Sequence, residues 1–147
     1  MNLSPHFTFA ELTVSQTALR KGLDNEPSAQ QVENLKRLCA TILEPARDVL
    51  NVPLKVTSGF RSPAVNTAVG GSPTSLHMDG CAADIVPVGV DLRDAFATLM
   101  CAGLPFDELF IECGAWLHMG VARPGTEPRG KYKIAVGYPG HWTYMDV

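Results

Sequence analysis

Two histidines and an aspartate are the residues of this sequence whose types and spacing most directly suggest shared chemistry. His77 and Asp84 are seven residues apart, with the small residues Gly80 and Ala82 between them, and His118 lies within a later apolar run. Small residues let the backbone turn so that two side chains can point to one place. An imidazole in an apolar run needs a polar partner if it is buried. A catalytic zinc ion takes three such ligands and keeps one position for water, so these residues predict a zinc site.

The residues around these three follow a longer pattern. The string from Ser75 to Asp84 reads Ser-Leu-His-Met-Asp-Gly-Cys-Ala-Ala-Asp, and Trp116-Leu117-His118 follows later. They resemble the Ser-x-His-x-x-Gly-x-Ala-x-Asp and Trp-x-His signatures of the zinc D-alanyl-D-alanine carboxypeptidase family. That family also carries an arginine sixteen residues before its first histidine ligand, which is the spacing from Arg61 to His77. The resemblance extends towards the N-terminus, and over this longer range the sequence is similar to the compact phage and prophage branch of the family, whose members are often endolysins or wall-remodelling peptidases.

The resemblance also implies catalytic roles. Arg61 becomes the cation for a substrate carboxylate or a developing oxyanion, because a planar guanidinium suits either group better than an ammonium does. Many relatives place the acidic base three positions before the last histidine ligand, where this chain has Ala115. A related branch that includes hedgehog-type domains has its glutamate six positions before that histidine, as Glu112 is before His118. A hairpin turning about Ala115 would set Glu112 opposite His118. We therefore predict Glu112 as the base, with Asp107 in reserve.

Three further residues, Ser75, Trp116 and His141, belong to the predicted site, and a fourth position departs from the family pattern. Some carboxypeptidases of the family stabilise the transition state with a histidine shortly before the last ligand, and Cys113 stands there in this chain. Ser75 is expected to orient the site through a hydrogen bond and not to act as a nucleophile. Trp116 and His141 are expected to contact the substrate or the metal ligands. For His141 this requires the C-terminal segment to fold back, and a surface or packing role is the alternative.

Hydrophobic periodicity and turn residues predict the elements that position these side chains. A helix is predicted to begin at Pro27-Ser28 and to run to Val49, with a break near 41–44 because Pro45 lacks an N–H. A second helix follows Asp91, and a short one covers 63–69. Strands are predicted at 54–58, 82–87, 108–112, 116–121, 132–136 and 141–145. The order predicts one α+β domain over residues 1–147, in which a small antiparallel sheet carries the zinc site and helices pack on one side.

Bulk composition narrows the range of functions. The chain has 147 residues, 46% of them hydrophobic, which is enough for one globular core. Its net charge of −3 argues against a nucleic-acid partner. The sequence has neither a long apolar window nor a basic and apolar leader, so we expect cytoplasmic synthesis without a signal peptide and no membrane insertion. The four cysteines lack Cys-x-x-Cys spacing and are expected to be reduced, and the protein is expected to be a monomer.

The ligand pattern predicts a zinc site, and the family resemblance implies a zinc-dependent peptidase that hydrolyses peptidoglycan stem peptides or cross-links beside a D-amino acid, as a phage or prophage endolysin or a wall-remodelling enzyme. Endopeptidase and carboxypeptidase activities both remain open, as do three bonds: L-Ala to D-Glu, D-Ala to diaminopimelate, and terminal D-Ala to D-Ala. Such an enzyme would reach the wall after holin-type release or as part of a phage particle. The alternative is a zinc-binding, non-catalytic module of hedgehog-like fold in wall binding or phage structure.

Overall fold

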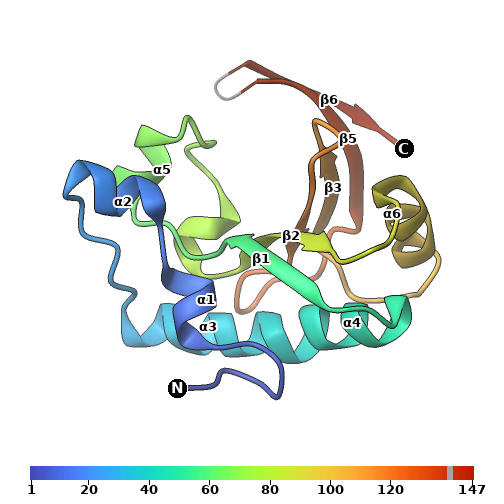
Figure 1. Cartoon of the computed structure of the whole chain (residues 1–147), viewed down its shortest axis with the longest axis horizontal. Helices are drawn as coiled ribbons and strands as arrows, with labels where there is room; N and C mark the ends of the chain where they lie inside the picture. Colours follow the sequence, from blue (N-terminus) through green and yellow to red (C-terminus); the bar gives the residue numbers. More distant parts are fainter. Residues whose placement is uncertain (139–140) are drawn as a thin grey trace.

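A six-stranded sheet organises the computed structural model, which describes residues 1–138 and 141–147 (Figure 1). The strand order is β1-β2-β4-β3-β5-β6. Within the described residues every neighbouring pair is antiparallel except β3 and β5, which run parallel. The chain leaves β4 and crosses back to pair with the far side of β3. The strands are β1 (Leu54–Ser58), β2 (Ala82–Pro87), β3 (Glu108–Glu112), β4 (Trp116–Gly120), β5 (Lys131–Tyr138) and β6 (His141–Asp146).

The helices pack against one face of this sheet or border the other, so the predicted α+β class is confirmed. The long α3–η1–α4 unit runs beneath β1 and β2, and α6 lies at its end (Figure 1). Two N-caps begin helices where the sequence predicts them: Ser28 accepts from the backbone N of Gln31, and Asp91 accepts from the backbone of residues 93 and 94. No helix of the described residues is both long and apolar enough to cross a membrane. The helical elements are α1 (Phe9–Thr13), α2 (Gln16–Lys21), α3 (Ala29–Leu38), η1 (Cys39–Leu43), α4 (Glu44–Leu50), α5 (Pro63–Ala68), η2 (Leu76–Asp79) and α6 (Leu92–Met100).

The break predicted near Pro45 is a π-helical segment and not an interruption. Residues 39–43 form the π-helix η1, and α4 follows with Pro45 in its first turn. The helix is continuous here, so Pro45 removes one backbone hydrogen bond, and its ring needs space next to the preceding turn. The π-helical turn, in which the backbone N–H of Glu44 donates to the carbonyl oxygen of Cys39, provides that space. The wider turn keeps the apolar face continuous, and Leu35, Leu38 and Ile42 are all fully buried. The helix departs from α geometry next to the proline and remains one element.

The two faces of the sheet differ in polarity, as the period of two along each strand requires. One face packs on α3, η1 and α6 and forms the core, with Ile85, Leu109, Leu117 and Met119 buried there. The other face carries charged and polar side chains that line a cavity. A slip of one residue in β2 or β4 would move a carboxylate or an imidazole into the core, so burial of the apolar face fixes the register.

The β3–β4 hairpin differs from the prediction in its register. Glu112 lies opposite Trp116, and His118 lies opposite Phe110. The expected pairing of Glu112 with His118 is therefore wrong, because the loop centres on Gly114 and not on Ala115. Cys113 and Gly114 both adopt positive φ values, +50° and +62°, which let a three-residue loop reverse the chain. Glu112 and His118 stay on one face as diagonal neighbours, a relation that typically separates Cα atoms by about 7–8 Å.

All four cysteines are free thiols. Cys39 and Cys81 are buried, and burial raises the pKa of Cys39 to about 12 and that of Cys81 to about 11. Such thiols stay protonated at neutral pH and pack as small hydrophobic residues. Cys101 and Cys113 are exposed, and Cys113 lies in the β3–β4 loop with its sulfur 2.8 Å from the carbonyl oxygen of Gly137.

Candidate metal centre

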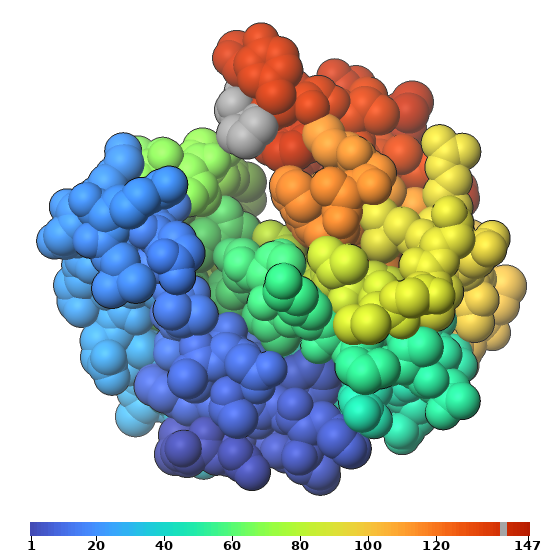
Figure 2. Space-filling model, viewed as in Figure 1, coloured from blue at the N-terminus to red at the C-terminus, as the bar shows by residue number. Residues whose placement is uncertain are grey.

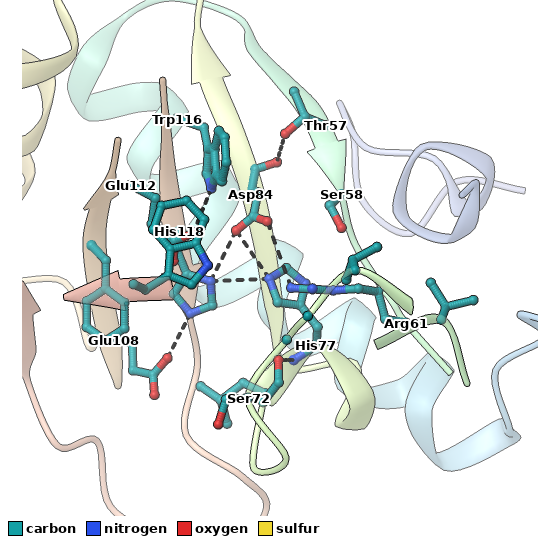
Figure 3. A pocket seen from close by; sticks show the side chains of 18 of the residues that line it. Thr57, Ser58, Arg61, Ser72, His77, Asp84, Glu108, Glu112, Trp116 and His118 are labelled. Carbon is teal, nitrogen blue, oxygen red and sulfur yellow. Dashed lines mark hydrogen bonds and ion pairs between the residues drawn. The ribbon is translucent and has the colours of Figure 1, made fainter. Parts of the chain in front are cut away.

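Three buried side chains converge where β2 and β4 are neighbours. Asp84 and His118 are directly opposite in the β2–β4 ladder, and His77 enters from η2, the short helix before β2. His77 Nε2 lies 3.2 Å from Asp84 Oδ1 and 3.2 Å from His118 Nδ1, and His118 Nδ1 lies 3.1 Å from Asp84 Oδ1 (Figure 3). The three residues singled out by the sequence therefore form one cluster of potential ligands.

The donor atoms of this cluster fit a zinc ion. Bonds of about 2.0–2.1 Å to a tetrahedral metal place ligand atoms about 3.4 Å apart, close to the distances seen here. The second ring nitrogen of each histidine has its own partner. His77 Nδ1 lies 2.7 Å from the carbonyl oxygen of Gly59, and His118 Nε2 lies 2.7 Å from Glu108 Oε2. These acceptors hold the proton of each ring on its outer nitrogen and leave the inner nitrogen with a lone pair for a metal.

Electrostatics at the cluster favour a positive charge. Burial lowers the pKa of His118, but hydrogen bonds to the Asp84 and Glu108 carboxylates outweigh it and raise that pKa to about 10. For His77 burial prevails, and its pKa is lowered, which suits a neutral imidazole ligand. Burial also acts to raise the pKa of Asp84, but the two histidines hold it well below its usual range. The carboxylates thus stabilise a cation at this position, whether a proton or a metal carries the charge.

The turn that carries His77 is fixed by α3. Gln31 Nε2 donates to the carbonyl oxygen of Met78 at 3.0 Å, and Asn34 Nδ2 donates to that of Asp79 at 2.7 Å. Gly80 ends the turn with φ of +69°, and a Cβ atom there would lie 2.5 Å from the carbonyl oxygen of Gln31. Position 80 therefore needs glycine for both its conformation and its space. These contacts fix the position of the backbone that carries the His77 side chain.

Ser75 caps the same turn from its other end. Its Oγ accepts from the backbone N of His77 at 3.2 Å, and the residue lines the cavity. This position allows Ser75 to orient the first histidine, as the sequence suggests, and leaves its hydroxyl oxygen engaged with the backbone.

Arg61 follows β1 in a loop that Asn25 holds in place. Asn25 Nδ2 donates to the carbonyl oxygens of Thr13 and Phe60, and its Oδ1 accepts from the backbone N of Ser62. The guanidinium then reaches the cluster, with Nη2 4.0 Å from Asp84 Oδ2. Its Nε is buried and has no hydrogen-bond partner among the described residues. A buried donor without a partner at the edge of a cavity is placed to bind a ligand.

Glu112 and Trp116 face the same cavity from the end of the β3–β4 hairpin. Trp116 Nε1 donates to Glu112 Oε2 at 3.1 Å and so restricts the carboxylate (Figure 3). Burial raises the pKa of Glu112, and the negative charge of Asp84 adds to this, against the lowering by His118 and Arg61. A carboxylate with a raised pKa, beside a metal cluster, is suited to moving protons.

Glu108 is a residue of the site that the sequence interpretation missed, and it contacts a metal ligand directly. It accepts from His118 and also from Arg129, whose Nη2 lies 2.8 Å from Glu108 Oε1. The strict alternation of Glu108, Phe110 and Glu112 along β3 is the signal that could have revealed it. Asp107, the reserve base, lies outside the cavity lining. Arg129 holds its carboxylate, with Nη2 2.7 Å from Oδ2.

On β6 the residues that line the cavity are Trp142 and Tyr144, and His141 has the surface and packing role that the sequence left open as the alternative. His141 is exposed and packs on Tyr138, with ring centroids 4.6 Å apart. Side chains alternate along a strand, so the neighbour of His141 points inward in its place. Trp142 packs edge-on against Trp116, with ring centroids 6.1 Å apart, and Tyr144 packs edge-on against Phe110, with ring centroids 5.4 Å apart.

The cavity that contains these groups has a volume of about 930 Å³. One wall comes from the start of α2, from α5 and from the loop that follows it, and the opposite wall comes from β3, β5 and β6. Figure 2 shows the hollow between the green segment around α5 and the orange β3–β4 hairpin. The metal cluster lies in the middle strands, so the cavity extends to both sides of it.

Comparison with known proteins agrees with this geometry. The sequence profile described as Peptidase M15 matches residues 5–120, a segment that includes the His-Asp-His cluster, Arg61 and Glu112. Comparison with curated proteins gives no match. The β5–β6 hairpin lies beyond the matched segment. The match covers most of the chain, and this protein therefore belongs to the M15 family of peptidases, which are zinc-dependent metallopeptidases.

Proposed function

We propose that this protein is a zinc endopeptidase that cuts D-amino-acid-containing peptides of bacterial peptidoglycan. The observation that carries the proposal is a buried His77–Asp84–His118 cluster that opens into a cavity. The same cavity contains the Arg61 guanidinium, whose buried Nε–H has no partner among residues 1–138 and 141–147, and the Glu112 carboxylate with its raised pKa. His77, Asp84 and His118 would hold the metal. Bound zinc supplies a Lewis acid for the scissile carbonyl and lowers the pKa of water.

Glu112 is assigned the proton transfers. Its carboxylate is on the same face as His118 and is held by the indole N–H of Trp116. A base with a pKa moved towards neutrality accepts the proton of the attacking water and can then donate it to the leaving amine. Both transfers need one carboxylate close to the reacting atoms, and Glu112 is the carboxylate of the cavity that is left once Asp84 is assigned to the metal and Glu108 to His118.

Arg61 is assigned the substrate oxygen. The Nε–H of its guanidinium, which has no partner in the described part of the chain, can donate to a carboxylate or to the oxygen on which negative charge develops during attack. The loop held by Asn25 places this group before substrate arrives, so little reorganisation is needed at the moment of reaction.

The shape of the cavity supports cleavage within a peptide over removal of a terminal residue. Its lining extends from the start of α2, at Gln16, across the cluster to Lys133 and Trp142 on the far side. A chain lying in it can occupy positions on both sides of the scissile bond. This favours stem peptides and cross-links as substrates and a role as a monomeric endolysin or wall-remodelling enzyme that acts outside the compartment of its synthesis. The inward position of Glu112 favours an enzyme over a zinc-binding module without turnover.

Digestion of purified peptidoglycan by the zinc-loaded protein, followed by mass spectrometry of the released muropeptides, tests this function. We expect new amino termini within stem peptides or cross-links. Release of terminal D-Ala alone would make the protein a carboxypeptidase. Wall binding with zinc present and no new termini would support the non-catalytic alternative and overturn the proposal.

Substitution of Glu112 tests the mechanism in the same assay. Glu112→Gln preserves size and should keep zinc, measured by elemental analysis, while turnover falls about 100-fold or more. Glu127→Gln, in an exposed loop, is the matched control and should behave as the unmodified protein. Wild-type turnover by Glu112→Gln would show that another group is the base.

A further inference from the structure

The net charge of the residues lining the cavity is positive, whereas the net charge of the whole chain is negative. The chain has 12 Lys and Arg residues against 15 Asp and Glu residues. The cavity nevertheless takes five of the cations and only three of the carboxylates, and one of these carboxylates belongs to the metal cluster. An excess of cations in a concave site attracts anionic ligands. The cations are Lys55, Arg61, Arg129, Lys131 and Lys133.

Two of these cations lie on β5, away from Arg61. Lys131 is aligned with Glu108, and Lys133 with Phe110, in the parallel β3–β5 ladder, so both side chains are on the cavity face. In the sheet order, β5 is two strands from β4, which carries His118, and Arg61 follows β1 on the other side. Two strand spacings are about 10 Å. That distance corresponds to about three residues of an extended peptide.

Lys131 and Lys133 are also available to a ligand, unlike their neighbour Arg129. Arg129 is engaged by both Asp107 and Glu108. Lys131 makes no ion pair within the part of the chain that the structure describes. Lys133 pairs with Asp146 at 3.3 Å, and the Asp146 side chain is 86% exposed. Exposed pairs of this kind are weak, so a substrate carboxylate can compete for Lys133.

We infer that Lys131 and Lys133 form a subsite that binds a carboxylate of an acidic peptide, within about three residues of the scissile bond. The inference rests on the proposed function for the identity of the ligand as a peptide, but it makes a separate claim about charge. The subsite lies on β5 of the C-terminal hairpin, outside residues 5–120 that match the family profile.

The two tryptophans of the chain make the subsite measurable without any reaction. Both Trp116 and Trp142 line the cavity, so a peptide that binds there should change the intrinsic fluorescence. The probes are the tetrapeptide L-Ala–D-Glu–diaminopimelate–D-Ala and the same peptide with the free carboxylates of its D-Glu and diaminopimelate residues amidated. The zinc-loaded Glu112→Gln protein is titrated with each, so that turnover does not disturb the equilibrium.

We expect the acidic tetrapeptide to bind more tightly than its amidated form. Adding Lys131→Ala and Lys133→Ala should raise the Kd of the acidic peptide by about three- to thirtyfold, because each exposed charge contact contributes modestly, and should leave that of the amidated peptide within about twofold. Lys36→Ala, a surface lysine of α3 paired with Glu33, is the control and should change neither. Lys131→Glu with Lys133→Glu should weaken binding of the acidic peptide further.

Equal binding of the acidic peptide by the parent and the double variants would overturn the inference, as would an equal loss for both peptides or no saturable signal from the acidic one. Retention of zinc by each variant checks that the fold is intact. Failure of the unmodified protein to cut peptidoglycan would count against the proposed function alone, because the fluorescence titration reads binding and not cleavage.

Discussion

Replacing Glu108 by glutamine is expected to weaken zinc binding although no metal ligand is removed. Glu108 Oε2 accepts from His118 Nε2 at 2.7 Å, and Oε1 accepts from Arg129 Nη2 at 2.8 Å. The first contact keeps the ring proton on Nε2 and so leaves Nδ1 free towards the cluster. The negative charge behind the ring also increases its basicity as a ligand.

The size of the effect follows from what the substitution keeps. Losing the carboxylate behind a ligating imidazole typically reduces metal affinity by about 10- to 100-fold, or about 1.4–2.8 kcal/mol. The glutamine amide oxygen can still accept the N–H of His118, so we expect a loss of about 10- to 30-fold. Arg129 remains bound to Asp107 through three side-chain hydrogen bonds, so the segment before β5 should stay in place.

Competition with a chromophoric zinc chelator at fixed pH measures this affinity directly. Glu33→Gln, which removes an exposed carboxylate on α3, serves as the control for the change in net charge. His118→Ala should lose most of the affinity and marks the lower limit. If Glu108→Gln bound zinc within twofold of the unmodified protein while His118→Ala did not bind it, the role given to Glu108 would be refuted.

Three other substitutions test separate parts of the structure. Arg61→Lys should keep the fold and the zinc but lower kcat/KM by about tenfold or more, because an ammonium cannot reproduce the contact that the guanidinium makes in the transition state. Activity within twofold of the unmodified protein would exclude a contact between Arg61 and the substrate. Burial raises the pKa of Glu44, but hydrogen bonds from Ser4 and His6 outweigh it and lower that pKa overall. The Glu44 carboxylate therefore stabilises the fold at pH values above its unfolded pKa, and this stabilisation is lost as the pH falls through its folded pKa. In urea unfolding, Glu44→Gln should be less stable than the unmodified protein at pH 7, and the difference between the two should shrink at low pH. Gly59→Ala should lower the free energy of unfolding by about 1–3 kcal/mol, since its Cβ would lie 2.2 Å from the carbonyl oxygen of Leu12, and an unchanged urea midpoint would contradict this.

The sequence predicts those parts of the fold that depend on neighbours along the chain. The strands at 54–58, 82–87 and 108–112 match their predicted bounds because alternation and flanking turn residues are local signals. The parallel pairing of β3 with β5 was not predicted, since it depends on a crossover whose course no local pattern records. The hairpin register was wrong because two successive positive φ values, at Cys113 and Gly114, moved the centre of the loop by one residue.

The candidate site divides in the same way. The metal cluster was predicted because its residues stand in a fixed pattern, and the structure brings them within ligand distance of one another. Glu108 was missed because it acts through His118 from a neighbouring strand, a contact between residues ten apart in sequence. On β6 the strand was predicted, and of the two roles left open for His141 the structure agrees with the surface and packing role, while Trp142 points into the cavity.

The family match ends at residue 120, before the sheet is complete, because the chain crosses over after β4 and adds β5 beside β3. A fragment ending at residue 120 would keep the His-Asp-His cluster, but it would leave β3 as an edge strand with one row of backbone N–H and C=O groups unpaired. That strand carries Leu109, Phe110 and Ile111 in succession, an apolar edge of the kind that pairs with other chains. We therefore expect such a fragment to self-associate. In the full chain β5 pairs with this edge of β3, so the C-terminal hairpin protects the sheet from aggregation and also forms a wall of the cavity.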